Sequence, residues 1–98
     1  MGYMRDRIGD AAMYEQLAEE CAELGQAALK MARILRGENP TPVTEDEASA
    51  MVLEEAADVL ICMDEVGALD RPEMPRIAHE KRERFEARWE EAHHASES

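Results

Sequence analysis

The sequence predicts an all-α fold, a helical bundle built on a long antiparallel helical hairpin plus a C-terminal helix. The chain is rich in Glu, Ala, Arg and Leu and only 4% aromatic, and such a composition favours helices over sheets. Apolar residues recur every three or four positions in three separate stretches, which is the period of amphipathic helices. Glycine and proline residues interrupt the sequence between these stretches and indicate turns.

The first predicted helix begins at Ala11, with Asp10 as its N-cap, and ends near Arg36. Gly37 follows as a C-terminal stop. Residues 1–9 form a polar start without a clear period, so no helix is predicted there. The apolar stripe of this first helix consists of Tyr14, Leu17, Cys21, Leu24, Ala28, Met31 and Leu35.

The second helix follows a loop that contains Pro40 and Pro42, which cannot continue a helix. Thr44 and Glu47 have the spacing of a capping box and start it. Gly67 ends it. Its apolar stripe consists of Ala48, Val52, Ala56, Val59, Leu60, Met63 and Val66.

A third helix is predicted to start near Pro75, with apolar or long side chains every four residues as far as Trp89. Residues 93–98 are expected to form a frayed C-terminal tail, which leaves residues 1–92 as a single domain. Because a chain of 98 residues buries only a modest core, we expect a homodimer or a dimer of dimers to complete the bundle.

The formal net charge of −12 repels phosphate backbones and anionic lipids, so no nucleic-acid or membrane partner is expected. No apolar run has the length of a membrane span or the features of a signal peptide. A cytoplasmic protein is therefore expected, with Cys21 and Cys62 as reduced thiols that fill small spaces in the core.

Two carboxylate motifs are the strongest functional signal. Glu20 and Glu23 are three residues apart in the first helix, and Glu55 and Asp58 have the same spacing in the second, so each pair shares a helix face. In an antiparallel hairpin all four lie at one level, about 20 Å from the loop. Four carboxylates this close need a cation, protonation or outward splaying.

An all-oxygen site selects Mg²⁺, or Mn²⁺ as a substitute, over zinc. The alternative is that both motifs belong to ordinary solvated acidic faces, because such spacings are common in acidic helices. The pairing of the motifs, their similar angular position and their common level favour the metal site.

These motifs, Glu19-Glu20-x-x-Glu23-Leu24 and Glu55-x-x-Asp58-Val59, resemble the signature of the all-α NTP pyrophosphohydrolases. This superfamily includes the MazG-like proteins, with dimeric dUTPases and phosphoribosyl-ATP pyrophosphohydrolases as relatives. The resemblance runs from about Tyr14 to Trp89. It implies that the two carboxylate pairs bind Mg²⁺ and that basic residues of the next helix complete the site.

The basic segment of the third helix contains Lys81, Arg84 and Arg88, which are expected to bind the triphosphate. Pairing with the interleaved glutamates of the same helix is an equally open interpretation. Lys30 on the first helix is a weaker phosphate-binding candidate. His79 stands where related members often carry an Asn.

The expected function is Mg²⁺-dependent hydrolysis of a nucleoside triphosphate to the monophosphate and diphosphate, a nucleotide-pool reaction. Glu19, Glu20 and Glu23 are the expected catalytic residues, and Glu19 or Glu23 would accept the proton of the attacking water. One alternative is a related enzyme for dUTP, dCTP or phosphoribosyl-ATP. The other is a non-catalytic bundle that binds nucleotides or a partner protein as a sensor.

Overall fold

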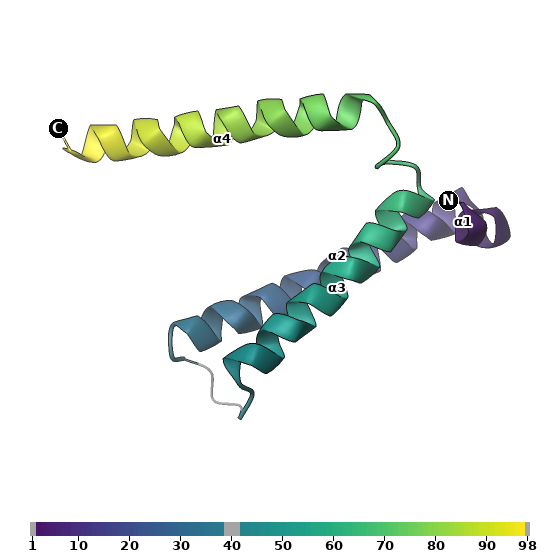
Figure 1. Ribbon diagram of the computed structural model, residues 1–98, viewed down its shortest axis with the longest axis horizontal. Helices are drawn as coiled ribbons and strands as arrows, with labels where there is room; N and C mark the ends of the chain where they lie inside the picture. The colour runs from purple at the N-terminus through teal and green to yellow at the C-terminus, as the bar shows by residue number, and fades with distance from the viewer. Residues whose placement is uncertain (1, 39–41, 98) are drawn as a thin grey trace. The chain divides into compact units, whose positions relative to one another are not determined.

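The computed structural model describes residues 2–38 and 42–97, with side chains through residue 94, and every regular element in these ranges is a helix. It has no strand in these two ranges, which confirms the all-α prediction. The chain divides into two compact units, Met1–Ala68 and Leu69–Ser98. The helices, drawn in Figure 1, are α1 (Tyr3–Ile8), α2 (Asp10–Leu35), α3 (Glu45–Glu65) and α4 (Glu73–Glu97).

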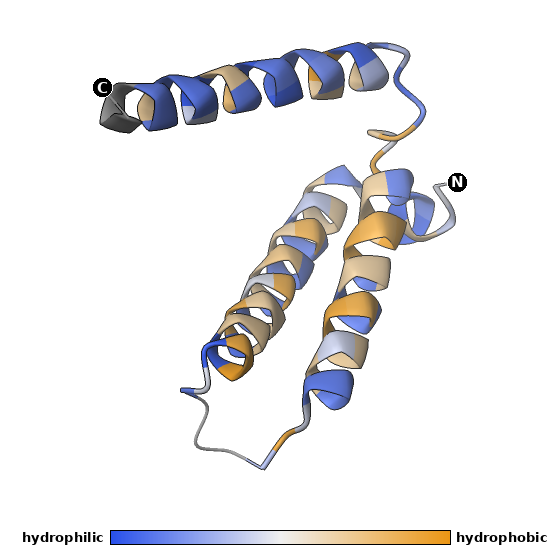
Figure 2. Cartoon of the chain, turned by 60° about the vertical axis from the view of Figure 1, so that its left-hand side comes forward, coloured by the Kyte–Doolittle hydropathy of each residue, from blue (hydrophilic) through white to orange (hydrophobic). Residues whose placement is uncertain are grey.

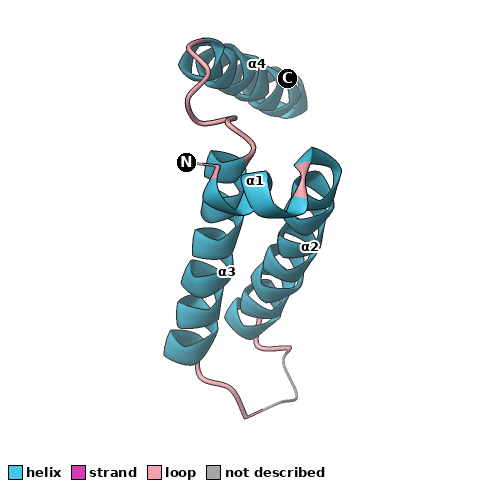
Figure 3. Cartoon of the chain, turned by 90° about the vertical axis from the view of Figure 1, so that its right-hand side faces the viewer, coloured by secondary structure: helices cyan, strands magenta, loops and turns pink. Residues whose placement is uncertain are grey.

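Helices α2 and α3 lie side by side and run in opposite directions (Figure 3). Figure 2 shows hydrophobic residues along both helices, interspersed with hydrophilic ones. The hydrophobic side chains buried among the described residues of this unit are small or slender, namely Met13, Ala27, Ala48 and Cys62. Small side chains occupy little space between two helices, so the backbones of α2 and α3 can approach closely.

Both long helices of this unit end in the same way. Gly37 has φ 74 and Gly67 has φ 80, a left-handed conformation that glycine adopts without a Cβ clash. The Gly37 amide donates to the Ile34 carbonyl at 3.0 Å, and the Glu38 amide donates to the Arg33 carbonyl at 2.9 Å. These two bonds form a Schellman motif, and the same pattern follows α3. The sequence-based helix ends are therefore confirmed.

The start of α3 is also as predicted. The Thr44 side chain accepts a hydrogen bond from the Glu47 amide at 3.1 Å, which satisfies one of the free amides at the helix N-terminus. Pro40, in the predicted loop before it, lies outside the described residues, as does Ser98 at the end of the predicted tail.

The sequence analysis missed α1 and was wrong about Asp10. Asp10 is the first residue of α2 instead of its N-cap, and Gly9 separates α1 from α2. Gly9 has φ 90 and ψ 162, a region that is almost restricted to glycine. Helix α1 contacts both α2 and α3. Its Arg5 amide donates to Glu65 Oε1 at 2.9 Å, so the buried Glu65 carboxylate caps the α1 N-terminus.

Helix α4 starts earlier and ends later than predicted. Glu73 is its first residue, and Pro75 lies in the first turn, where a missing amide is tolerated. Residues 93–97 are helical rather than frayed. His93 Nδ1 lies 2.8 Å from the Trp89 carbonyl oxygen, and the two rings stack with centroids 3.5 Å apart. These contacts extend the helix past the expected end.

No helix in the described part of the chain combines the length and apolar character needed to span a membrane.

Replacement of Thr44 by alanine is predicted to destabilise the protein. Thr44→Ala removes the hydroxyl that accepts from the Glu47 amide and should lower the free energy of unfolding by about 1 kcal/mol. Thr44→Ser keeps the acceptor and should lose much less. Urea unfolding at one fixed protein concentration measures both. Equal losses in the two variants would show that the hydroxyl does not cap α3.

Candidate metal centre

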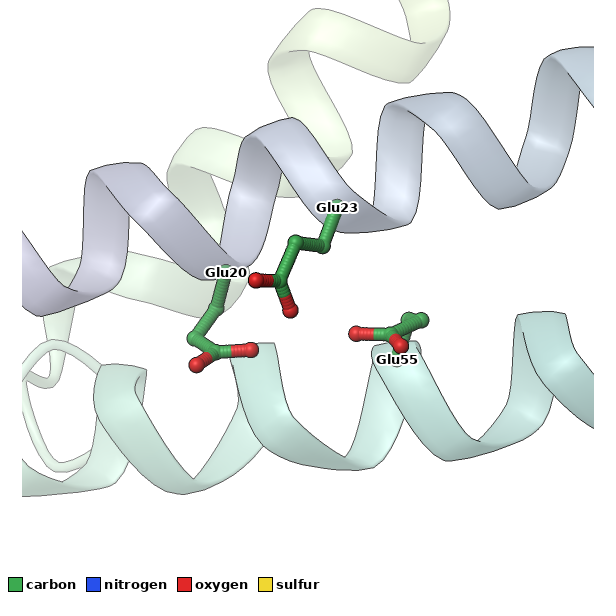
Figure 4. A group of neighbouring side chains, drawn as sticks. All are labelled: Glu20, Glu23 and Glu55. Atoms are coloured by element: carbon green, nitrogen blue, oxygen red, sulfur yellow. The ribbon is translucent and has the colours of Figure 1, made fainter.

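Three carboxylates converge between α2 and α3 (Figure 4). Glu20 and Glu23 come from α2, and Glu55 comes from α3. One carboxylate oxygen from each lies within 4.8 Å of the other two. Glu20 and Glu55 are half-buried, whereas Glu23 is exposed. We call these three residues the carboxylate cluster.

The helix geometry explains why the cluster forms. The spacing of three residues places Glu20 and Glu23 one turn apart on the same side of α2. The close approach of α2 to α3 brings Glu55 opposite them. Neither helix alone could gather three carboxylates within this distance, so the site depends on the packing of the pair.

Two oxygens in the cluster lack protein partners. Glu20 Oε1 accepts a hydrogen bond from the Gln16 side-chain amide at 2.8 Å. Glu20 Oε2 and Glu55 Oε2 are inaccessible to solvent and have no hydrogen-bond partner among the described residues. A buried carboxylate oxygen without a donor is unfavourable. Three ionised carboxylates at this separation also repel one another. A bound cation would give these oxygens a partner and would reduce the repulsion among the carboxylates.

Two other predicted carboxylates lie outside the cluster. Asp58 is exposed and follows Glu55 by three residues on α3. Asp58 and Glu20 both act electrostatically on Cys62. Glu19 is exposed on α2 and is not part of the group within 4.8 Å. The structure therefore brings together three of the four predicted metal ligands.

The predicted phosphate-binding residues lie in both units. Lys30 is half-buried on α2, two turns after Glu23 and about 10 Å further along the axis. Lys81, Arg84 and Arg88 are exposed on α4. None of these four forms an ion pair with a residue that the structure describes.

Other basic residues of α4 do pair with its glutamates. Arg76 contacts Glu80 at 3.2 Å, and His79 contacts Glu83 at 2.8 Å. Both pairs have the (i, i+4) spacing of helix-surface ion pairs. Arg76 and His79 therefore pair with glutamates of their own helix, as the alternative interpretation of the basic segment expected. The three predicted phosphate-binding residues of α4 keep their charges available for another partner.

Two residues near the cluster were not singled out as site residues from the sequence. Gln16 lies one turn before Glu20, and that spacing was the only signal for its hydrogen bond. Cys62 was expected to be a core residue, and it is buried with 5% of its surface exposed. The charge of Glu20 near Cys62 could not be placed from the sequence, because Glu20 and Cys62 lie on different helices.

Burial raises the pKa of the Cys62 thiol, and the negative charges of Glu20 and Asp58 raise it further. Both effects disfavour the thiolate. The protonated thiol is a poor nucleophile. Cys62 is therefore expected to react slowly. The prediction that both cysteines fill the core is confirmed for Cys62 and wrong for Cys21, which is exposed on α2.

Comparisons of the chain with protein-family models, with curated protein sequences and with solved structures found no match. The family resemblance therefore remains a prediction from the two carboxylate motifs. Any assignment of function rests on these motifs and on the geometry of the carboxylate cluster.

The two thiols are predicted to differ in reactivity. Cys21→Ser leaves only Cys62, and Cys62→Ala leaves only Cys21. With a chelator at pH 8, an aromatic disulfide reagent should modify Cys62 at least about tenfold more slowly than Cys21 because the Cys62 thiol is buried and protonated. In denaturant the two rates should agree. Equal rates in the folded proteins would contradict the burial of Cys62.

The raised pKa of Cys62 also predicts a pH dependence of stability. An unfolded thiol ionises near pH 8.5, and the folded Cys62 thiol ionises at higher pH. The stability linked to this group is therefore present below about pH 8.5 and is lost as the pH rises through the folded pKa. In urea, Cys21→Ser should lose more stability at alkaline pH than the double variant Cys21→Ser, Cys62→Ala.

Proposed function

We propose that this chain is a Mg²⁺-dependent pyrophosphohydrolase that converts a nucleoside triphosphate and water into the nucleoside monophosphate and diphosphate. The observation that carries the proposal is the carboxylate cluster, in which two buried oxygens, Glu20 Oε2 and Glu55 Oε2, have no donor among the described residues. The two motifs that form it are those that resemble the all-α NTP pyrophosphohydrolases.

The donor set fits a hard divalent cation. The cluster offers only carboxylate oxygens, the ligands that Mg²⁺ and Mn²⁺ prefer. Glu20, Glu23 and Glu55 would hold the ion, and Asp58, one turn after Glu55, would complete the set. When bound, the ion would supply positive charge to the phosphate oxygens and would increase the acidity of water.

The side chains around the ion have separate tasks in this proposal. Glu23 is the exposed member of the cluster, so its carboxylate can meet solvent water and accept the proton during attack on the α-phosphorus. Glu19, exposed on the same helix, is the alternative proton acceptor. Lys30 would contact the phosphates from α2.

The basic residues of α4 would bind the leaving diphosphate. The guanidinium groups of Arg84 and Arg88 match phosphate oxygens in geometry, and Lys81 adds a positive charge. Their lack of ion-pair partners among the described residues supports this role.

Removal of a cluster carboxylate is predicted to abolish turnover. Diphosphate release from a panel of NTPs and deoxynucleotides, read with Mg²⁺, identifies the best substrate of the parent chain. With that substrate, Glu23→Gln and Glu55→Gln should each lower kcat by about 100-fold or more, because each loses a charged oxygen needed for the ion or the proton.

Glu54→Gln is the matched control for Glu55→Gln. Glu54 precedes Glu55 on α3 but is exposed and lies outside the cluster, so its replacement should leave kcat unchanged. Equal activity in all three variants would place the reaction elsewhere. Tight nucleotide binding by the parent without diphosphate release would favour the sensor function instead.

We also propose that a second copy of the chain completes the helical bundle. Apolar side chains that are exposed on α3 and α4 support this proposal. Leu53 is 71% exposed and Ile61 is 58% exposed, and both lie on one face of α3. On α4, Phe85 is 70% exposed and Trp89 is 56% exposed. Apolar surface of this kind is usually covered in an assembly.

The assembled protein is predicted to be a homodimer or a dimer of dimers. Sedimentation at micromolar concentration should give two or four times the 11.0 kDa mass of one chain. Leu53→Glu should shift the equilibrium towards smaller species, since a charge would be buried without a partner. A parent protein that sediments as a monomer would contradict the proposed assembly.

A further inference from the structure

Gln16 holds one oxygen of the candidate metal ligand Glu20. Its side-chain nitrogen donates to Glu20 Oε1 at 2.8 Å, in a partly buried bond between residues four apart on α2. The two residues lie on adjacent turns of one face. The bond therefore fixes the carboxylate from the side of the preceding turn.

The chemistry of this contact determines which atom faces the carboxylate. The amide nitrogen is a donor and the amide oxygen is an acceptor, so only the nitrogen can satisfy Glu20 Oε1. The donor is neutral, which distinguishes it from a lysine or arginine at the same place. Gln16 thus orients the Glu20 carboxylate and leaves its negative charge available to a cation.

The second oxygen of the same carboxylate has a different environment. Glu20 Oε2 is buried and has no hydrogen-bond partner among the described residues. Because a carboxylate is planar and rigid, fixing Oε1 restricts the direction in which Oε2 points. Figure 4 shows the Glu20 carboxylate between α2 and α3, together with Glu23 and Glu55.

We propose that Gln16 is a positioning residue for the metal centre, and that it presents Glu20 Oε2 to the divalent cation by holding Oε1. This inference rests on the cation site of the proposed function. Hydrogen bonds to ligating carboxylates are a general means of orienting metal ligands, and their removal typically weakens metal affinity by about 10-fold to 100-fold. Gln16 acts through Glu20 and is assigned no contact with the nucleotide.

The chain offers a matched control on the same helix. Gln26 is also on α2, but it is exposed and lies outside the carboxylate cluster. Leucine is close to glutamine in size and has no donor, and it favours helix as strongly. Gln16→Leu and Gln26→Leu therefore make the same chemical change, and only the first removes a bond to Glu20.

The test measures Mn²⁺ binding to the whole chain without nucleotide, from the electron paramagnetic resonance signal of free Mn²⁺ up to millimolar concentration. Gln16→Leu should weaken binding by about 10-fold to 100-fold, whereas Gln26→Leu should bind as the parent does. In a Glu20→Gln background, Gln16→Leu should change the affinity by less than about twofold, because the oxygen it positions is no longer charged. Circular dichroism checks that each variant keeps its helix.

Each other outcome overturns the proposal in a distinguishable way. Parent-like Mn²⁺ affinity in Gln16→Leu would show that Gln16 does not position the ligand, while the metal site and the proposed function would stand. Equal weakening with and without the Glu20 carboxylate would show that Gln16 acts through general structure. A parent chain that binds no Mn²⁺ would overturn both the positioning role and the metal-dependent function.

Discussion

The close packing of α2 against α3 is the constraint on which the rest of the structure depends. Ala27 of α2 and Ala48 and Cys62 of α3 are small buried side chains, and small side chains allow two helix backbones to approach. The same approach brings Glu55 of α3 to the carboxylates of α2, with oxygens within 4.8 Å of one another. Apolar burial thus holds together groups that repel each other in the absence of a cation.

This arrangement has a consequence for stability. A small core supplies little hydrophobic free energy, and the like charges of the cluster oppose folding of the isolated chain. In the proposed function, a cation at the cluster and burial of the exposed apolar side chains of α3 and α4 in an assembly would both stabilise the folded state. Binding of either kind stabilises the folded state by mass action. The proposed function therefore couples metal binding and assembly to folding.

The end of the pair away from the α2–α3 loop is organised by a different carboxylate. Glu65 is buried and accepts the Arg5 amide at 2.9 Å, so it ties α1 to the end of α3. Gly9 supplies the backbone conformation that lets α1 turn back onto the pair. Carboxylate oxygens buried in the described part of the chain thus have two distinct environments. Glu65 receives a donor from the backbone, whereas Glu20 Oε2 and Glu55 Oε2 receive none from the described residues.

The sequence alone determined the all-α class, the glycine ends of α2 and α3 and the Thr44 cap, because these features depend on neighbouring residues. It also identified the three cluster carboxylates, since helical spacing fixes which residues share a face. It missed α1, whose capping carboxylate lies 60 positions away at Glu65. Only the tertiary structure decided that Glu55 joins Glu20 and Glu23 while Asp58 stays exposed, because a periodic pattern gives the face of a helix but not the distance between two helices.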